Sequence, residues 1–541
     1  MVSFKNTAYL FFILIIAFFL RFYQLGSNPP SLTWDEAAWG YNAYSLGIDG
    51  RDEFGKFLPI DHLESFGDFK PPVYAYLDII PVKIFGLTEF ATRFPSALFG
   101  VLTILITYFL VKRIFYKSEN ANIYGILTSF ILAISPWHIM LSRAAFEANI
   151  ATFFIITGVW LFLGGVQERK WYLLFSAISF SFSIYTFNTA RVVAPLIILM
   201  LGIGFWKILL EKYTQTIMAV IIGILLLLPT LKFLLSPQAS LRFKEVNIFS
   251  ESGVVVSANQ QIANDNNSSW SKIIHNRRLA YGVEYIRHYF DNLNPSFLFI
   301  KGDGNPKFST QTVGEMYLWE LPFFIMGILF LFKKREGYWW IIPLWLILGI
   351  VPAATARETP HALRIETTLP TFQIFTAIGF LTVINLLKKY KKLAISILSF
   401  VLFINFMYFY RDYLVHYPRE FSGEWQYGYK NSISYVESQK DNFDQIDITM
   451  ALGRPYIYYL FYTKKNPKDY RKEAIIQREV FGFVNVNGFD KYRFAKNLSD
   501  IDNRNKKVLY IGIPNGVPSS ANVLKTFYLL NGDKALVAYT L

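Results

Sequence analysis

The sequence has no cysteine among its 541 residues and only six histidines. The absence of cysteine excludes disulfide frameworks, cysteine-based zinc sites and cysteine nucleophiles. Charged residues are also scarce, at 17%, whereas 53% of the residues are hydrophobic and 18% are aromatic. This balance is too apolar for an ordinary water-soluble enzyme, so we expect a membrane protein.

Long apolar segments recur through the first 410 positions. A helix needs roughly 20 apolar residues to cross a bilayer, and about eleven segments reach or approach that length. The predicted fold class is therefore a mainly α, polytopic integral membrane protein with about eleven transmembrane helices. These helices are expected near residues 7–22, 93–113, 121–141, 149–166, 171–187, 192–210, 214–235, 319–332, 338–353, 368–387 and 393–410.

The excess of positive charge lies between alternate apolar segments. The chain has 53 basic and 39 acidic residues, a formal charge of +14. Lysine and arginine in short loops stay cytoplasmic, and an N-terminus inside places +11 of this charge there. The pattern predicts a multi-pass protein of the plasma membrane with a cytoplasmic N-terminus. The nearly neutral remainder excludes nucleic acid as a partner. The cytoplasmic segments are 1–6, 112–119, 168–170, 207–212, 333–336 and 388–392.

The same orientation places every large hydrophilic segment outside the cell. We predict a transmembrane catalytic domain over residues 1–410, which includes a first outer loop at 23–92 and a long outer loop at 236–318. Within the long loop, Ser257–Ser271 is rich in serine, asparagine and glutamine and is expected to be a mobile loop segment. Residues 411–541 are predicted to form an extracytoplasmic α/β domain.

The C-terminal region contains short apolar runs typical of buried strands. A hairpin is expected around Asn531-Gly532, a dipeptide favoured in two-residue turns. Pro455–Tyr462 fits a helix or a strand equally well on periodicity alone. The expected strands are Ile446–Met450, Lys507–Ile513, Phe527–Leu530 and Ala535–Tyr539.

The first outer loop carries the densest group of reactive side chains. The stretch LTWDEAAWGY (32–41) presents Asp35 and Glu36 directly after an apolar helix, and GDFKPP (67–72) adds Lys70. The amphipathic run Val73–Phe85 is expected to lie along the membrane interface. Interfacial aromatics and solvated acids are common in such loops, but a carboxylate near a lysine also suits chemistry on an anionic lipid headgroup.

Several motifs in a fixed order resemble a known family. WDEA, GDFKPPVYAY and GLTEFATRFPSALFG are followed by similar segments at 135–154, 187–196, 297–327 and 360–370. The set resembles the membrane-embedded GT-C glycosyltransferases, specifically the protein O-mannosyltransferase and aminoarabinose transferase branch. The resemblance implies an inverting enzyme that transfers a sugar from a polyprenyl-phosphate donor to a protein, lipid or glycan on the outer face. No cofactor is certain: the polyprenyl-phosphate sugar is the donor substrate, a divalent metal ion is a candidate cofactor, and membrane lipids are the other partners.

The resemblance also implies roles for individual residues. Asp35 matches the catalytic aspartate, and a carboxylate is needed because an acceptor hydroxyl ionises far above neutral pH. The departing phosphate needs cationic stabilisation, for which Lys70 matches the family lysine. The guanidinium group of arginine can bind two phosphate oxygens at once. Long cationic side chains near the ends of membrane helices also often extend to the headgroup layer without binding a substrate. Glu36, next to Asp35, is the second catalytic candidate. Further phosphate-binding candidates are Arg143, Arg191, His361 and Arg364, and additional site candidates are Asp68, Glu147 and Asp303.

Two departures from the family pattern concern a metal ion. Phe69 precedes Lys70 where the aminoarabinose transferases have glutamate, and Gly302–Phe308 lacks the histidine of bacterial relatives. Asp35 and Glu36 are the candidate ligands for a divalent cation, but no histidine spacing supports such a site.

Two alternative functions stay open at this point. Oligosaccharyltransferases share the GT-C architecture, and WQYG (425–428) echoes their WWDYG signature with Gln426 at the aspartate position. A transporter or flippase of lipid-linked sugars is the second alternative. Transporters place polar groups at the bilayer midplane, whereas the ionisable residues here gather at the outer ends of the predicted helices.

Overall fold

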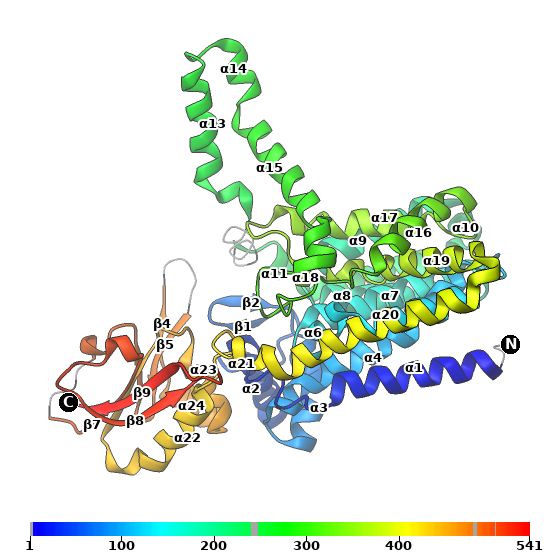
Figure 1. Ribbon diagram of the computed structural model, residues 1–541. Coiled ribbons are helices and arrows are strands. Elements are labelled where there is room, and N and C mark those ends of the chain that lie inside the picture. Colours follow the sequence, from blue (N-terminus) through cyan, green and yellow to red (C-terminus); the bar gives the residue numbers. More distant parts are fainter. Residues whose placement is uncertain (1–3, 238, 240–246, 480–483, 502, 504) are drawn as a thin grey trace. The chain divides into compact units, whose positions relative to one another are not determined.

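The computed structural model describes residues 4–237, 239, 247–479, 484–501, 503 and 505–541 (Figure 1). The chain divides into two compact units. The helical unit contains Met1–Leu20, Phe99–Leu141 and Ala148–Met407, and the mixed unit contains Arg21–Leu98, Ser142–Glu147 and Tyr408–Leu541. The first outer loop and the C-terminal region therefore share one unit.

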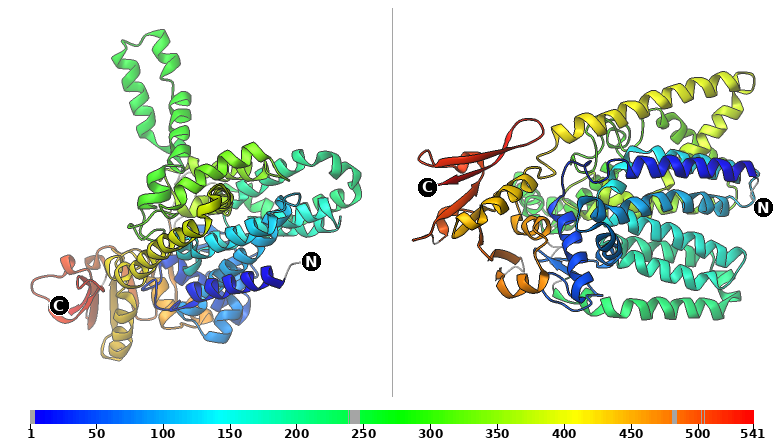
Figure 2. Two further views of the ribbon diagram at one scale, coloured as in Figure 1. Left: turned by 45° about the vertical axis from the view of Figure 1, so that its right-hand side comes forward. Right: turned by 90° about the horizontal axis from the view of Figure 1, so that it is seen from below.

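A helix occurs at each of the eleven predicted positions. Their axes run side by side through most of the helical unit, as both views in Figure 2 show. Short helices α10 (Trp206–Glu211) and α18 (Ala362–Ile365) join longer ones. The eleven positions are occupied by α1 (Phe4–Phe22), α4 (Glu89–Ile114), α5 (Ala121–Ile134) with α6 (Pro136–Arg143), α7 (Glu147–Gln167), α8 (Tyr172–Ile184), α9 (Ala190–Gly204), α11 (Tyr213–Leu234), α16 (Glu320–Lys334), α17 (Ile341–Ile350), α19 (Thr371–Leu386) and α20 (Lys391–Arg411).

Fewer helices meet the criteria for crossing a membrane on their own. Within the described residues, four are long and apolar enough, or up to six if each of two bent pairs counts as one span. The long ones are Glu89–Ile114, Glu147–Gln167, Tyr213–Leu234 and Lys388–Glu420. Eleven crossings therefore stay a prediction.

The predicted span over 121–141 consists of two helices, α5 and α6, which meet at a bend of 58°. A similar bend of 62° separates Ala362–Thr368 from α19. Each bend lies next to a proline, and a residue before proline avoids the helical conformation. Ser135 and Leu369 are accordingly extended, with ψ of 127° and 142°.

Helices α16 and α19 pack with their backbones in contact. A Cβ atom at Gly327 would lie 1.8 Å from the Phe375 carbonyl oxygen, and one at Gly379 would lie 1.8 Å from that of Phe323. Small residues at such crossings allow close helix packing inside membranes. A larger side chain at either glycine would separate the two helices.

The long outer loop contains more helix than the sequence predicts. Helices α13 (Ser252–Asn264), α14 (Ser269–Ile274) and α15 (Arg277–Asp291) form a projecting arm of the helical unit (Figure 1). Most of Ser257–Ser271 is therefore helical, and the expectation of a loop there is wrong. Asn276 caps α15 by accepting the N–H groups of Arg278 and Leu279.

The mixed unit begins with the first outer loop. Helix α2 (Trp34–Asp49) is followed by a hairpin of β1 (Leu63–Ser65) and β2 (Asp68–Lys70), and then by α3 (Val73–Phe85). The helix expected over Val73–Phe85 is confirmed, whereas the hairpin had no prediction. Its turn residues Phe66 and Gly67 both have positive φ, 63° and 82°, as a two-residue type I′ turn requires.

A seven-stranded sheet forms most of the C-terminal region. Strand β3 (Gln445–Thr449) is parallel to both of its neighbours, and the other pairs are antiparallel. The predicted strands and hairpin are confirmed, and Pro455–Tyr462 is helix α23. The order is β4 (Ile475–Arg478), β5 (Val484–Phe489), β6 (Tyr492–Ala495), β3, β7 (Val508–Gly512), β9 (Lys534–Thr540) and β8 (Asn522–Tyr528), with helices α22 (Tyr429–Gln439) and α24 (Pro467–Glu473) beside it.

One hydrophobic core joins the first outer loop to this sheet. Ala37 and Tyr41 of α2 pack in the same buried cluster as Tyr456 and Leu460 of α23. The Tyr41 hydroxyl also donates a hydrogen bond of 3.0 Å to the Lys465 carbonyl. The C-terminal region therefore supports the start of α2, which carries the WDE motif.

Candidate functional site

The first turn of α2 holds the two adjacent carboxylates of the WDE motif in different environments. Thr33 caps the helix, and its N–H donates to Glu36 Oε2 at 2.9 Å, which completes a capping box. Glu36 points inward and is fully buried. The side chain of Asp35 remains 50% exposed, so it is the carboxylate that a substrate can reach.

Glu36 forms a buried ion pair with Arg93. Arg93 Nε lies 2.8 Å from Glu36 Oε1, and both side chains are inaccessible to solvent. Arg93 also donates to the backbone carbonyls of Leu25, Pro29 and Ser31. The pair therefore ties the segment before α2 to the start of α4. The family motif GLTEFATRFPSALFG contains Arg93, but its role depends on a contact 57 residues away that the sequence does not reveal.

Asp35 is paired with Lys70. The Lys70 ammonium group donates to Asp35 Oδ1, and the lysine side chain is only 8% exposed. Its nitrogen lies 5.1 Å from the ring centre of Trp39 and 5.4 Å from that of Phe66. The β1–β2 turn supplies Phe66, so the hairpin encloses the charged end of the lysine between two aromatic rings.

Three acidic side chains interact electrostatically with the Lys70 ammonium group. Burial lowers the pKa of Lys70, but the charges of Asp35 and Asp68 outweigh that effect, so the pKa is raised overall. Glu147, the first residue of α7, interacts with the same ammonium group. The predicted residues Asp35, Asp68, Lys70 and Glu147 therefore lie together, around a lysine that is protonated at neutral pH.

Arg143 lies in a second cationic part of the mixed unit. It is fully buried, and its Nη2 donates to the Asn28 carbonyl at 2.9 Å. Its Nε donates to the Tyr413 hydroxyl at 3.2 Å. Arg21 and Arg93 are also fully buried, and Arg21 feels the charge of Arg143. The charge of Arg93 is balanced by Glu36, which leaves Arg21 and Arg143 as two neighbouring buried cations that favour the binding of an anion.

The helical unit brings together another group of predicted residues. Asp303 Oδ2 accepts the N–H of Ala362 at 2.7 Å and lies 3.8 Å from His361 Nδ1. Burial raises the pKa of Asp303 to about 6. Burial and the nearby Arg364 hold the pKa of His361 well below its ordinary value. The imidazole is therefore neutral at pH 7, and this cluster presents Arg364 as its cation.

Two further acids complete this cluster. Glu315 Oε1 accepts the N–H of Asp303 at 2.9 Å, and Glu315 interacts electrostatically with Glu366.

Arg191, also in the helical unit, has its guanidinium 5.7 Å from the ring centre of Phe233.

The donor set does not favour a metal ion at the WDE motif. Glu36 already accepts hydrogen bonds from Arg93, Thr33 N–H and Ala145 N–H, so it cannot chelate together with Asp35. Across the described ranges, no three His, Cys, Asp or Glu side chains form a group that could hold a metal. No catalytic step below depends on a metal.

The side chains of Trp425 and Gln426 in the WQYG stretch form hydrogen bonds within the protein. Trp425 is fully buried, and its indole donates to the Tyr417 hydroxyl at 2.7 Å. The Gln426 amide donates to the Leu452 carbonyl at 2.8 Å and accepts from Tyr458. The ring of Trp425 lies 5.8 Å from the Arg93 guanidinium. Through these contacts the WQYG stretch packs beside the Glu36–Arg93 ion pair.

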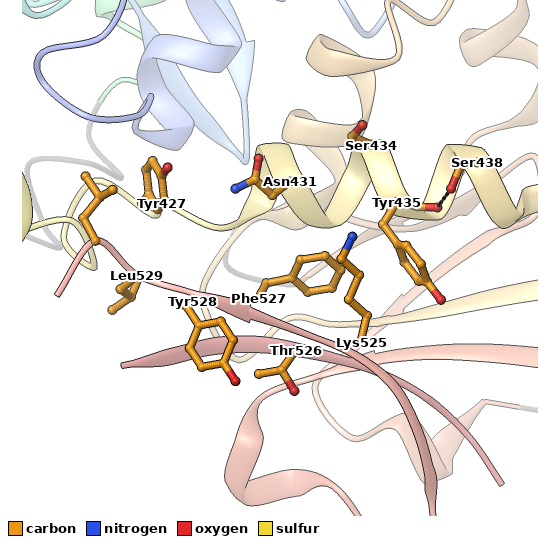
Figure 3. A pocket seen from close by; sticks show the side chains of 11 residues that line it. Tyr427, Asn431, Ser434, Tyr435, Ser438, Lys525, Thr526, Phe527, Tyr528 and Leu529 are labelled. Carbon is orange, nitrogen blue, oxygen red and sulfur yellow. Dashed lines mark hydrogen bonds between the residues drawn. The ribbon is translucent and has the colours of Figure 1, made fainter. Parts of the chain in front are cut away.

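An open groove of about 580 Å³ lies between α22 and the edge strand β8 (Figure 3). The groove combines aromatic rings with hydroxyl and amide groups. Lys525 is its one charged residue and lies 4.9 Å from the ring centre of Tyr435. Rings can stack on the apolar face of a sugar while the polar groups bond its hydroxyls. The lining residues are Tyr427, Asn431, Ser434, Tyr435, Ser438, Lys525, Thr526, Phe527, Tyr528, Leu529 and Leu530.

Comparison with solved structures identifies the fold. The chain is similar to ArnT from Cupriavidus metallidurans in the apo state, with a TM-score of 0.57 and 12% identity over 99% of this chain and 98% of that one. The oligosaccharyltransferase of Archaeoglobus fulgidus follows with a TM-score of 0.50 and 15% identity over 85% of this chain and 64% of that one. The protein therefore has the GT-C fold of membrane glycosyltransferases.

Sequence comparison agrees with this class. Residues 69–233 match the dolichyl-phosphate-mannose-protein mannosyltransferase family. The inferred mannosyltransferase YkcB of Bacillus subtilis (strain 168) is 29% identical over 108 residues, 20% of this chain and 14% of that protein. An uncharacterised Aquifex aeolicus (strain VF5) protein is 30% identical over 202 residues, 37% of each chain. The matches thus span well under half of these relatives. The resemblance expected from the WDEA and GDFKPP motifs is confirmed.

Proposed function

We propose that the protein is an inverting glycosyltransferase of the outer face of the plasma membrane. It moves a sugar from a polyprenyl-phosphate carrier to a protein, lipid or glycan acceptor, with Asp35 as the general base. The observation that carries this proposal is the half-exposed Asp35 carboxylate held against the buried Lys70 ammonium. The similarity in fold to ArnT bound to undecaprenyl phosphate, with a TM-score of 0.55, supports a lipid-linked donor.

The reaction divides between the two partners of this ion pair. Asp35 accepts the proton of the acceptor hydroxyl while that oxygen forms its bond to the anomeric carbon. The bond from that carbon to the phosphate oxygen breaks on the opposite side, and its electrons leave with the phosphate. Lys70 stabilises the departing phosphate. Attack opposite the leaving group inverts the configuration of the sugar.

Donor binding has to rearrange the resting ion pair. The Lys70 ammonium donates to Asp35. A donor phosphate competes for the same ammonium, and its arrival releases the aspartate to face the acceptor. The base is then freed only when a donor is present, which limits unproductive proton transfer.

The other predicted residues take supporting roles in this proposal. Glu36 acts as a positioning residue, because its bonds to Thr33 and Arg93 hold the first turn of α2. Asp68, Glu147 and Asp303 remain additional site carboxylates, and Glu147 shares the electrostatic environment of Lys70. The further proposed donor-phosphate residues are Arg143, Arg191, His361 and Arg364.

We also propose the membrane orientation that the charge pattern predicts. Residues 1–410 form the catalytic transmembrane domain with the N-terminus in the cytoplasm, and 411–541 form the extracytoplasmic domain. The groove between α22 and β8 then faces the compartment in which acceptors occur, and we assign it to acceptor binding because its rings and hydroxyls suit a saccharide or glycosylated acceptor.

The experiment is sugar transfer in nanodiscs with radiolabelled undecaprenyl-phosphate mannose as the first donor and a membrane extract as acceptor. Asp35→Asn should abolish transfer while the protein still inserts and folds. Asp61→Asn is the matched control, because Asp61 is a partly exposed acid of the same loop that is also paired with a lysine. Near-normal turnover by Asp35→Asn would overturn the assignment of the base.

A further inference from the structure

The arm formed by α13, α14 and α15 is anchored to the helical unit along one face of α15. The Tyr289 hydroxyl donates to the Ile347 carbonyl of α17 at 2.8 Å, and the Tyr285 hydroxyl donates to the Val351 carbonyl at 3.2 Å. The His288 ring lies 2.8 Å from the Ala356 carbonyl oxygen. These contacts hold α15 beside the C-terminal end of α17.

The arm runs across the direction of the bundle helices. Figures 1 and 2 show it extending sideways from one end of the helical unit, whereas α7, α16, α17 and α19 run along the unit. Helices that cross a bilayer lie near its normal. An element that leaves their ends at a steep angle extends along the membrane surface.

The face of α15 opposite its anchors is an apolar stripe. Leu279, Val283, Ile286 and Phe290 are 50%, 68%, 57% and 62% exposed. At roughly 100° per residue, these four positions fall within an arc of about 60°. His288 lies on the opposite side of the helix. A stripe this exposed does not contribute to the core of the helical unit.

The surroundings of the stripe match the headgroup region of a bilayer. Trp270 and Ile273 of α14 are 55% and 68% exposed, and tryptophan is enriched at membrane interfaces. The helical geometry places Arg278 and Arg287 on the two flanks of the stripe, about 80–100° from its centre. Basic flanks beside an apolar face are typical of helices that lie in the plane of a membrane.

We propose that this arm is a lipid-binding element that lies in the outer leaflet. The apolar stripe of α15 enters the boundary between headgroups and acyl chains, and Arg278 and Arg287 contact lipid phosphates. The occupant of the stripe is the bilayer itself, because the stripe faces away from the anchored side and the arm extends across the bundle direction. The inference rests on the membrane location and on the proposed orientation, and it does not depend on the proposed sugar transfer.

The end of α15 is also bonded to the segment that carries His361 and Arg364. The last turn of α15 continues into Asn292, whose Oδ1 accepts the His361 N–H at 3.0 Å. Thr359 donates to the Asp291 carboxylate at 3.0 Å.

The cysteine-free sequence allows a direct test with single spin labels. Val283→Cys places a nitroxide on the stripe, and Arg277→Cys places one on the opposite face as the matched control. The full chain is placed in nanodiscs of phosphatidylcholine and phosphatidylglycerol. The label at 283 should collide more often with oxygen than with a water-soluble nickel chelate, and the label at 277 should show the reverse. Transfer to an amphipathic polymer without lipid should remove the difference.

Two results would overturn the proposal. Equal access of the nickel chelate to both labels would mean that the arm extends into water. Shielding at 283 that persists without lipid, with dipolar broadening between labels on two molecules, would mean that a second copy covers the stripe. Phe290→Cys serves as a second stripe position, so a single variant that misfolds does not decide the outcome.

Discussion

Lys70 donates a hydrogen bond to Asp35 from a position 35 residues further along the chain. The aspartate stays half exposed, whereas the lysine is almost completely buried between Trp39 and Phe66. The pair therefore joins a reachable carboxylate to a cation that cannot easily lose its proton. This relationship supports the first prediction.

Lys70→Gln should lower kcat by roughly 10²–10³-fold, the usual effect of losing one group that stabilises developing negative charge. The KM for the acceptor should change little, because the proposed partner of the lysine is the donor phosphate. Steady-state kinetics with varied donor and acceptor measure both effects. Lys56→Gln, which removes a lysine paired with Asp61 in the same loop, is the control. Equal kcat values for Lys70→Gln and the wild type would return Lys70 to a purely structural role.

Arg93→Met should destabilise the protein by about 3–5 kcal/mol, because it leaves the Glu36 charge buried without its partner. Thermal unfolding in detergent measures this loss. The comparison is Lys430→Met, which breaks the more exposed pair with Glu89 and should cost less than about 1 kcal/mol. A Glu36→Gln, Arg93→Met double variant should recover part of the loss. Equal melting temperatures for the two single variants would contradict the role given to Arg93.

Glu53 should make stability depend on pH. It is fully buried, accepts a hydrogen bond of 2.6 Å from Ser65, and has its pKa raised by burial to about 8. A carboxyl with a raised pKa keeps its proton in the folded state, whereas the unfolded chain loses it near the ordinary glutamate pKa of 4.5. Its contribution therefore falls as pH rises from about 4.5 to about 8, by at most roughly 1.4 kcal/mol per pH unit.

Melting temperatures measured from pH 5 to pH 8 test this sign. Glu53→Gln keeps the size of the side chain and removes the titration, so its melting temperature should decline less over that range. Glu64→Gln in the same loop serves as the control. A steeper decline for Glu53→Gln than for the wild type would contradict the assignment.

Substitutions in the groove between α22 and β8 should affect acceptor use alone. Tyr435→Ala and Lys525→Gln remove a ring and the cation that lies over it. We expect a several-fold higher KM for the acceptor and an unchanged KM for the donor, because the loss of one aromatic contact costs about 1 kcal/mol. Lys534→Gln, an exposed charge on β9, is the control. A rise in donor KM would show that the groove is not specific to the acceptor.

Several parts of this protein follow from local sequence. The eleven apolar segments are helical because a long apolar stretch in a membrane must satisfy its own backbone hydrogen bonds. The strands β3 and β7 and the Asn531-Gly532 hairpin also follow from short apolar runs and turn residues. The motifs WDEA and GDFKPP single out Asp35 and Lys70 as candidate site residues, although they do not show that the two side chains touch.

Other features depend on which residues meet in three dimensions. The periodicity of Pro455–Tyr462 fits a helix or a strand. In the structure this segment is a helix, and it packs against α2 in the same hydrophobic core. Glu36 and Asp35 are neighbours with the same chemistry in the sequence, yet the contact with Arg93 buries one and leaves the other exposed. The strands β4 to β6 had no prediction, because each is only four to six residues long.

The sequence by itself determined the class of protein, since apolar length, charge placement and motif order are local properties of the chain. It also determined the candidate base and its cation. Only the tertiary structure decided that Arg93 holds Glu36, that Asp303 meets His361, and that a polar outer loop forms an arm with an apolar face. Each of these depends on contacts between residues distant in sequence, and the energies of such contacts are not encoded in any local pattern.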